Sequence, residues 1–309
     1  MPAGVLRAGQ IVLAAALLAL LWRVAGGDEA LRSLATAQWG WLVAAVAILT
    51  LQTGLSALRW KLTAGRLGIR LGAREALREY YLAQAVNVSV PGGVVGDAGR
   101  ALRSRAQAGL LAAGQAVLFE RLAGQAGLYV ILVASFAVTL TSPGGIAWPT
   151  WLLLPVAVFI AAGLCLPLGL GRAKRIRGRM GSVLCGLRDA ARRSLLAPPV
   201  IVPQIALSLA TALCNLTAFG VCAVAVGHGL SPAAIAAFGP IILLTMLVPV
   251  TISGWGLREG AAVVLFPLAG GTASGGLTAS IAFGLMLIAA SLPGAVAVLG
   301  GARRDRVDP

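Results

Sequence analysis

Six ionisable side chains lie in or beside strongly apolar stretches of the sequence, and they are its best candidates for chemistry. They are three carboxylates and three guanidinium groups: Asp97, Arg100, Glu120, Arg121, Arg258 and Glu259. A charged side chain at the centre of a membrane helix costs about 2.5–3.5 kcal/mol on insertion scales, so such residues normally face a bundle interior or a wet cavity. Because a guanidinium group binds phosphate oxygens in pairs, one interpretation is a polar cavity for a phosphate-bearing ligand. The other is a set of structural salt bridges.

Two Gly- and Pro-rich stretches interrupt the apolar sequence around these side chains, at Asn87–Arg100 and at Pro249–Gly260. Irregular backbone is tolerated at membrane depth only where protein or a water-filled cavity satisfies it, and paired interruptions in two halves of a chain are typical of a midplane binding site. Glycines also let backbone amides approach an anion, although small residues equally serve close helix packing. The predicted substrate-binding residues are Asn87, Pro91, Gly92, Gly93, Gly96, Asp97, Arg100, Glu120, Arg121, Gly254, Gly256, Arg258 and Glu259.

The composition places both stretches in a membrane protein. Of the 309 residues, 59% are apolar and 11% are charged, whereas soluble domains average about 25% charged. The mean hydropathy is +0.90. This length holds about seven or eight membrane segments of about 20 residues each. We therefore predict an all-α polytopic membrane protein in which residues 1–309 form a single integral membrane domain.

Apolar runs locate the elements that must position the charged residues. We expect a first segment at 9–21 that is retained rather than cleaved, followed by a weakly charged loop at Asp28–Arg32. The remaining predicted segments are 39–60, with Trp39 and Trp60 as interface anchors, and 116–140, 151–170, 203–226, 233–250, 257–268 and 277–299. The broken motifs fall at about 80–100 and about 233–268.

Basic residues are dense between the apolar runs and give the chain a formal net charge of +15. They cluster at 59–78, 100–105, 172–193 and 303–306, which places these segments and the C-terminus in the cytoplasm. Helical spacing predicts a surface helix near 73–80 and a basic amphipathic interfacial helix at about 172–196. On this topology the motif at 80–100 is a re-entrant hairpin entered from the cytoplasm. The second motif is entered from outside, and such opposed segments are typical of an inverted repeat.

The basic charge favours anionic lipid headgroups as partners, and nucleic acid is not expected. The sequence contains no nucleophile elbow, no Walker loop and no metal-ligand spacing, so we expect no cofactor and no metal. An enzymatic role is therefore disfavoured. A carboxylate pair, Asp97 with Glu120 or Glu259, is the one candidate for acid/base chemistry.

Four elements of the sequence together resemble a known family. They are Arg59-Trp60, Tyr80-Tyr81 leading into Asn87–Arg100, Glu120-Arg121-Leu122, and Ser253–Gly260. This combination is similar to the flippase-like transmembrane region of lysylphosphatidylglycerol synthases and of stand-alone relatives associated with hopanoid biosynthesis and archaeal glycosylation. The resemblance extends over essentially the whole chain.

The resemblance implies a protein that moves or presents lipids across the bilayer. The residues that match the family's polar core are Asp97, Arg100, Glu120, Arg121 and Glu259. Trp255 and Arg258 depart from it, because relatives often carry small or apolar residues there. The chain stops at Pro309 without a soluble aminoacyltransferase domain, so we expect neither lysyl transfer nor tRNA binding.

These observations predict a flippase or transporter for an anionic phospholipid or a polyprenyl-type lipid in a bacterial plasma membrane. Two alternatives remain open. One is an intramembrane enzyme that modifies a lipid or a polyprenyl-phosphate carrier. The other is a non-transporting scaffold that binds lipid- or glycan-synthesis enzymes.

Overall fold

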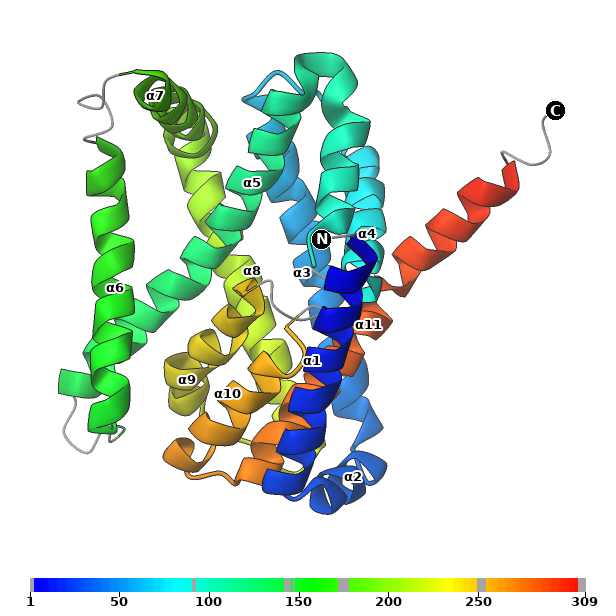
Figure 1. The fold of residues 1–309 in the computed structure, drawn as a ribbon, viewed down its shortest axis with the longest axis vertical. Coiled ribbons are helices and arrows are strands. Elements are labelled where there is room, and N and C mark those ends of the chain that lie inside the picture. The colour runs from blue at the N-terminus through cyan, green and yellow to red at the C-terminus, as the bar shows by residue number, and fades with distance from the viewer. Residues whose placement is uncertain are drawn as a thin grey trace.

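The computed structural model of the chain describes residues 3–90, 93–141, 146, 148–171, 178–248 and 254–304, which are helical and contain no strand. The helices, shown in Figure 1, are α1 (Ala3–Val24), α2 (Gly27–Ala35), α3 (Trp39–Gly65), α4 (Ala73–Ser89), α5 (Val95–Thr141), α6 (Thr150–Gly171), α7 (Arg179–Ala191), α8 (Pro198–Ala225), α9 (Pro232–Leu244), α10 (Leu257–Leu265) and α11 (Ala273–Arg304). Short π or 3-10 turns are η2 (Arg192–Leu196), η3 (Thr245–Leu247) and η4 (Pro267–Ala269).

Four of the described helices are long and apolar enough to cross a membrane: α3, α5, α8 and the Ala273–Ala295 part of α11. A fifth results if α1 and α2, whose axes meet at 93°, are counted as one broken segment. The apolar parts of α6 and of α9 with η3 are shorter. The chain is therefore an all-α protein with membrane-spanning helices.

The antiparallel pair α3 and α8 defines two ends of the bundle. At one end, which we call the basic end, Arg66 follows α3 and its Nε donates to the carbonyl of Arg193 at 3.5 Å. At the other end, which we call the opposite end, the amide of Gln38 before α3 donates to the carbonyl of Ala225 in α8 at 2.8 Å. Figure 1 shows α7 at the basic end and α2 at the opposite end.

The first broken segment is the tip of an antiparallel helical hairpin, here called hairpin 1, whose arms are α4 and residues 95–108 of α5. Its outer ends lie together at the basic end, because the side chain of Gln107 accepts from the amide of Arg70 at 2.7 Å and donates to its carbonyl at 3.1 Å. At Gly109 the backbone is left-handed (φ 82°, ψ 165°), which breaks α5. The rest of α5 then crosses the molecule diagonally (Figure 1).

The second broken segment belongs to hairpin 2, which is formed by α9 with η3 and by α10. Its outer ends lie at the opposite end of the bundle. A Cβ atom added at Gly271, after α10, would lie 3.2 Å from Leu230, before α9. Residues 249–253 at its tip lie outside the described residues, and Gly254 and Gly256 then continue in positive-φ conformations (79° and 90°). The two hairpins therefore point into the bundle from opposite ends.

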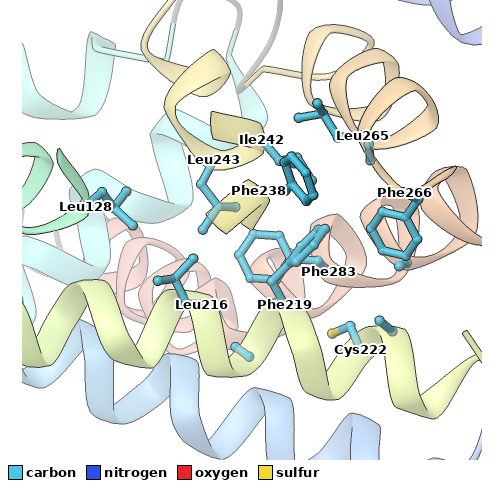
Figure 2. Close-up of a cluster of buried hydrophobic side chains, with 14 of the residues drawn as sticks. Leu128, Leu216, Phe219, Cys222, Phe238, Ile242, Leu243, Leu265, Phe266 and Phe283 are labelled. Carbon is cyan, nitrogen blue, oxygen red and sulfur yellow. The ribbon is translucent and has the colours of Figure 1, made fainter. Parts of the chain in front are cut away.

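Apolar packing fixes both hairpins against the rest of the bundle. Figure 2 shows Phe219 of α8 near Phe266 and Phe283, and the ring centroids are 6.1 and 5.6 Å apart in edge-to-face arrangements. Such pairs contribute about 0.5–1.5 kcal/mol beyond the area that they bury. A smaller cluster around the fully buried Trp60 packs hairpin 1 against α3 and α5. The two hairpins are thus packed elements rather than loose loops.

Three local predictions were wrong. Residues Asp28–Arg32 belong to helix α2 rather than to a loop, because Gly26 turns the chain at φ 77° and Ala30 then packs into the interior. Helix α4 is continuous from Ala73 to Ser89, so no separate surface helix precedes the hairpin. Helix α3 continues past Trp60 to Gly65, and Trp60 is fully buried among other helices rather than exposed as an anchor at the end of a segment.

Other predicted elements are covered only in part. Helix α7 and η2 cover residues 179–196 of the predicted basic helix, while residues 172–177 lie outside the described residues. The same holds for Pro91 and Gly92 at the tip of hairpin 1 and for Arg306 near the C-terminus.

Candidate functional site

A cavity of about 290 Å³ lies where the tips of the two hairpins meet α3, α5, α8 and α11. Its walls follow the helical repeat. On α5, Arg121, Gly124, Gln125 and Leu128 line it at i, i+3, i+4 and i+7 spacing, which places them on one face. Thr211 and Asn215 repeat this spacing on α8. Residues far apart in the sequence therefore share one site.

Five charged side chains form one connected network at the polar wall, which we call the Glu120 cluster. Its members are Arg59, Asp97, Arg100, Glu120 and Arg121. The fully buried Glu120 accepts from Arg59 Nη2 at 2.8 Å and from Arg100 Nη2 at 3.1 Å. Asp97 accepts from Arg100 at 2.9 Å and pairs with Arg121.

The Glu120 cluster carries one positive charge in excess, because it contains three guanidinium groups and two carboxylates. Its charge is only partly compensated, since the buried atoms Arg59 Nε, Arg100 Nε and Arg100 Nη1 find no acceptor among the described residues. A buried charge is normally paired, because removing it from water carries a large penalty. The cluster therefore retains one positive charge that no carboxylate within it compensates.

Arg100 supports this cluster from behind rather than facing the cavity. Its guanidinium carbon lies 4.5 Å from the centre of the Trp60 ring and 4.6 Å from that of Tyr80. The side chain is 1% exposed and does not line the cavity. Cation–π contacts of this kind contribute about 2 kcal/mol when they are desolvated. We therefore assign Arg100 to the positioning of Asp97 and Glu120.

Hairpin 2 supplies a second buried ion pair at the same cavity. Arg258 lines the cavity, and its Nη2 donates to Glu259 at 2.5 Å and to the carbonyl of Ser280 at 3.0 Å. The carboxylate of Glu259 also accepts from the amide of Gly256 at 2.6 Å, which caps α10. Glu259 thus fixes Arg258 at the start of the helix and does not itself line the cavity.

The two hairpins present their arginines in the same manner. Arg100 stacks on two aromatic rings and pairs with Asp97 of its own hairpin. The guanidinium carbon of Arg258 likewise lies 5.2 Å from the Trp255 ring centre and 5.5 Å from that of Phe283. Arg258 also pairs with Glu259, its neighbour in sequence. Trp255 and Arg258, the residues that depart from the family pattern, therefore form one packed unit.

The predicted site residues separate into three groups. Those that line the cavity are Asn87, Gly93, Asp97, Glu120, Arg121 and Arg258. Those that lie behind its walls are Gly96, Arg100, Gly254, Gly256 and Glu259. Pro91 and Gly92 lie outside the described residues. Asn87 closes hairpin 1, since its Oδ1 accepts from the amide of Gly96 at 2.8 Å and its Nδ2 donates to Asp97 at 3.1 Å.

Arg59 is the largest omission from the predicted site, because it was assigned to the cytoplasmic basic loop. It is instead buried inside α3 and lines the cavity. Gly124 makes room for it, since a Cβ atom there would lie 2.7 Å from Arg59 Nη2. Four further residues that line the cavity were not predicted: the carboxamides Gln52, Gln84, Gln125 and Asn215. A sequence signal for them did exist, because each is a polar side chain within an apolar stretch, and a polar side chain that faces lipid is costly in a membrane.

Another part of the cavity wall is apolar. It is built by α9, η3 and α11, from Leu243, Met246, Leu247, Phe283, Leu287 and Ile288. Leu247 and Ile288 are also 47% and 37% exposed, so this wall continues onto the outer surface of the bundle. On the polar side, the Arg121 side chain is 43% exposed. The cavity is therefore amphipathic and open at its edge.

Comparison with known proteins gives a family. No curated protein and no solved structure matches the chain. A family model described as the lysylphosphatidylglycerol synthase TM region matches residues 7–294, which includes both hairpins and every residue that lines the cavity. The chain belongs to the lysylphosphatidylglycerol synthase transmembrane-region family.

Proposed function

We propose that this protein is a flippase or lipid transporter that moves an anionic lipid across the cytoplasmic membrane. The observation that carries the proposal is the amphipathic cavity between the two hairpins, whose lining combines a polar wall with one excess positive charge and an apolar wall. A phospholipid has the same division, because its anionic headgroup is joined to apolar chains. Family membership supports a lipid-related role in the membrane.

The exposed edge of the cavity supplies a route for the lipid. The headgroup would contact Arg121 first and then reach Arg59 and Arg258 within the cavity. The chains would remain along Leu247 and Ile288, in contact with the bilayer. With this division the apolar chains stay out of water. The charged headgroup crosses along the polar wall, and its passage through the apolar interior of the bilayer is the main barrier to spontaneous lipid movement.

The arrangement in the membrane follows from the same geometry. We expect seven or eight membrane segments, with the hairpins as two opposed re-entrant segments of an inverted repeat. Two observations support this: the hairpins point inward from opposite ends, and each carries an arginine stacked on two rings. The positive-inside rule places the basic end and the C-terminus in the cytoplasm.

Cysteine labelling tests this orientation. In a protein without its four native cysteines, Thr36→Cys at the opposite end is expected to react with a membrane-impermeant maleimide in intact cells. Gly186→Cys in α7, where no atom lies within 4 Å of an added Cβ, is expected to react only after the membrane is permeabilised. Labelling of Gly186→Cys in intact cells would contradict the orientation.

Transport is tested with purified protein in vesicles that contain a fluorescent anionic phospholipid. Its movement is followed by the loss of fluorescence when dithionite is added outside. Arg121→Gln is expected to slow the movement by about 10- to 100-fold, since hydrogen bonds to charged groups contribute about 1.5–3 kcal/mol. The matched control is Arg103→Gln, which removes an exposed arginine that pairs with Glu79 and does not line the cavity.

Two outcomes would contradict the proposal. The first is equal slowing by Arg121→Gln and Arg103→Gln, which would separate transport from the cavity. The second is a folded wild-type protein that moves no anionic phospholipid and no polyprenyl-phosphate probe. That result would favour the enzyme or scaffold alternatives.

A further inference from the structure

Besides Asn87, four carboxamide side chains line the cavity, and much of their hydrogen-bonding capacity is unused among the described residues. Gln125 and Asn215 make no hydrogen bond to any described residue, and the buried Oε1 atom of Gln125 is left without a donor. Gln84 accepts from Thr53 at 3.0 Å but donates to no described group. Gln52 donates to Ser56 at 3.1 Å, and its oxygen accepts from no described group.

No contact with a described residue accounts for the buried Oε1 atom of Gln125, while the four side chains as a whole are half-buried. Buried polar atoms are normally paired, because an unpaired one loses its hydrogen bond to water and gains nothing in return. Two of the carboxamides also lie one helical turn from residues that do have partners. Gln125 follows Arg121 on α5, and Asn215 follows Thr211 on α8, both at i, i+4 spacing. Each unpaired carboxamide is therefore held beside a charged or hydroxyl group that is already in place.

The chemistry of the carboxamide indicates what these groups recognise. A carboxamide offers both a carbonyl acceptor and N–H donors, and a hydroxyl group likewise donates and accepts. A phosphate diester only accepts hydrogen bonds, and an ammonium group only donates them. Several carboxamides together are thus matched by several hydroxyl groups.

We propose that the cavity recognises a lipid headgroup that is a single sugar or cyclic polyol joined through one phosphodiester. This inference rests on the lipid transport proposed above. The phosphodiester supplies the one negative charge that the Glu120 cluster lacks. The ring hydroxyls reach Gln84, Gln125 and Asn215, which line the same cavity, and Gln125 lies one helical turn from Arg121, or about 5–6 Å between their Cβ atoms. The volume of about 290 Å³ suits one headgroup and not a whole lipid.

Three phospholipids of equal charge test the inference: phosphatidylinositol with a hydroxylated ring, phosphatidylglycerol with a short polyol, and phosphatidylmethanol without a headgroup hydroxyl. Fluorescent forms are compared in the vesicle assay, and their binding to the protein in detergent is measured by native mass spectrometry. We expect phosphatidylinositol to move and bind at least about 10-fold better than phosphatidylmethanol, with phosphatidylglycerol between them. A tenfold preference corresponds to one or two hydrogen bonds.

The double variant Gln125→Met, Asn215→Leu removes the hydrogen-bonding groups at similar volume. It is expected to bring the preference for phosphatidylinositol over phosphatidylmethanol below about 2-fold. Its thermal midpoint should not fall, because neither carboxamide has a partner among the described residues. The matched control is Gln115→Met, which changes a glutamine on the same helix that does not line the cavity.

The outcomes separate this inference from the proposed function. Equal movement of the three lipids, still slowed by Arg121→Gln, would overturn the headgroup inference and leave transport standing. Graded binding without any movement would support the headgroup and overturn transport. Equal binding without movement would overturn both the headgroup inference and the transport proposal, and the carboxamides would then only bind water molecules in the cavity.

Discussion

Glu120→Gln is expected to lower the free energy of unfolding by about 3–5 kcal/mol, the cost of removing one partner from a buried ion pair. Glu120 is fully buried and its carboxylate contacts both Arg59 and Arg100. After the change, three guanidinium groups share Asp97, and two positive charges are uncompensated. The effect is measured as a shift in thermal and SDS-induced unfolding in detergent micelles. Lipid transport should fall with it.

A matched substitution separates burial from charge. Glu79→Gln also removes a carboxylate from an ion pair on hairpin 1, but its partner Arg103 is 47% exposed. Exposed pairs contribute about 0–1 kcal/mol, so this variant should unfold almost as the wild type does. Adding Arg59→Gln to Glu120→Gln should recover part of the loss, because it removes one uncompensated charge. Equal losses for Glu120→Gln and Glu79→Gln would rule out a buried cluster.

Much of the fold follows from local sequence. The Pro and Gly residues of Asn87–Arg100 and Pro249–Gly260 break the helices, and both breaks lie at the hairpin tips. Predictions from local sequence were wrong where a contact between distant residues determines the position of a side chain. Arg59 lies next to dense basic residues and therefore resembles the start of a cytoplasmic loop. It is instead inside α3, because Glu120, which lies 61 residues later, supplies its counter-charge.

The candidate site was predictable to a similar extent. The pattern of charged residues beside broken backbone identified six residues that line the cavity, because a charged side chain in an apolar segment is costly and normally faces a bundle interior or a wet cavity. The carboxamides are harder to assign, because a glutamine in a helix can face lipid, a neighbouring helix or a cavity. Which face of α5 or α8 points inward depends on how the two helices cross. That geometry is set by contacts between distant segments, such as Gly127 of α5 against the backbone of Ser208.

Both hairpins depend on a stacked arginine, and this similarity bears on mechanism. Arg100 is fixed by Trp60 and Tyr80, and Arg258 by Trp255 and Phe283. A guanidinium group held between rings cannot follow a lipid across the membrane. The mobile contact is then Arg121, whose side chain is exposed at the edge of the cavity. The buried ion pairs would keep their positions, and with them the electrostatic field of the cavity, while Arg121 binds the incoming headgroup.

Gly96→Ala is expected to destabilise the protein by about 3 kcal/mol, at the upper end of the usual cost of overpacking. A Cβ atom at this position would lie 2.0 Å from the carbonyl oxygen of Ala83 in α4. That atom belongs to the helix backbone, so the two arms of hairpin 1 must separate. The separation would stretch the 2.8 Å hydrogen bond from the Gly96 amide to Asn87. Asn87 would then release Asp97, and both unfolding temperature and transport should fall.

Gly114→Ala is the matched control for Gly96→Ala, because it adds the same methyl group to the same helix. No atom lies within 4 Å of an added Cβ at Gly114. Alanine loses less backbone freedom than glycine on folding, so this change should stabilise the protein by about 0.5–1 kcal/mol. The two alanine variants are thus expected to shift the unfolding midpoint in opposite directions. A shift of the same sign and size in both would show that the arms of hairpin 1 are not in close contact, and Asp97 would then lack the support that holds it beside Arg121.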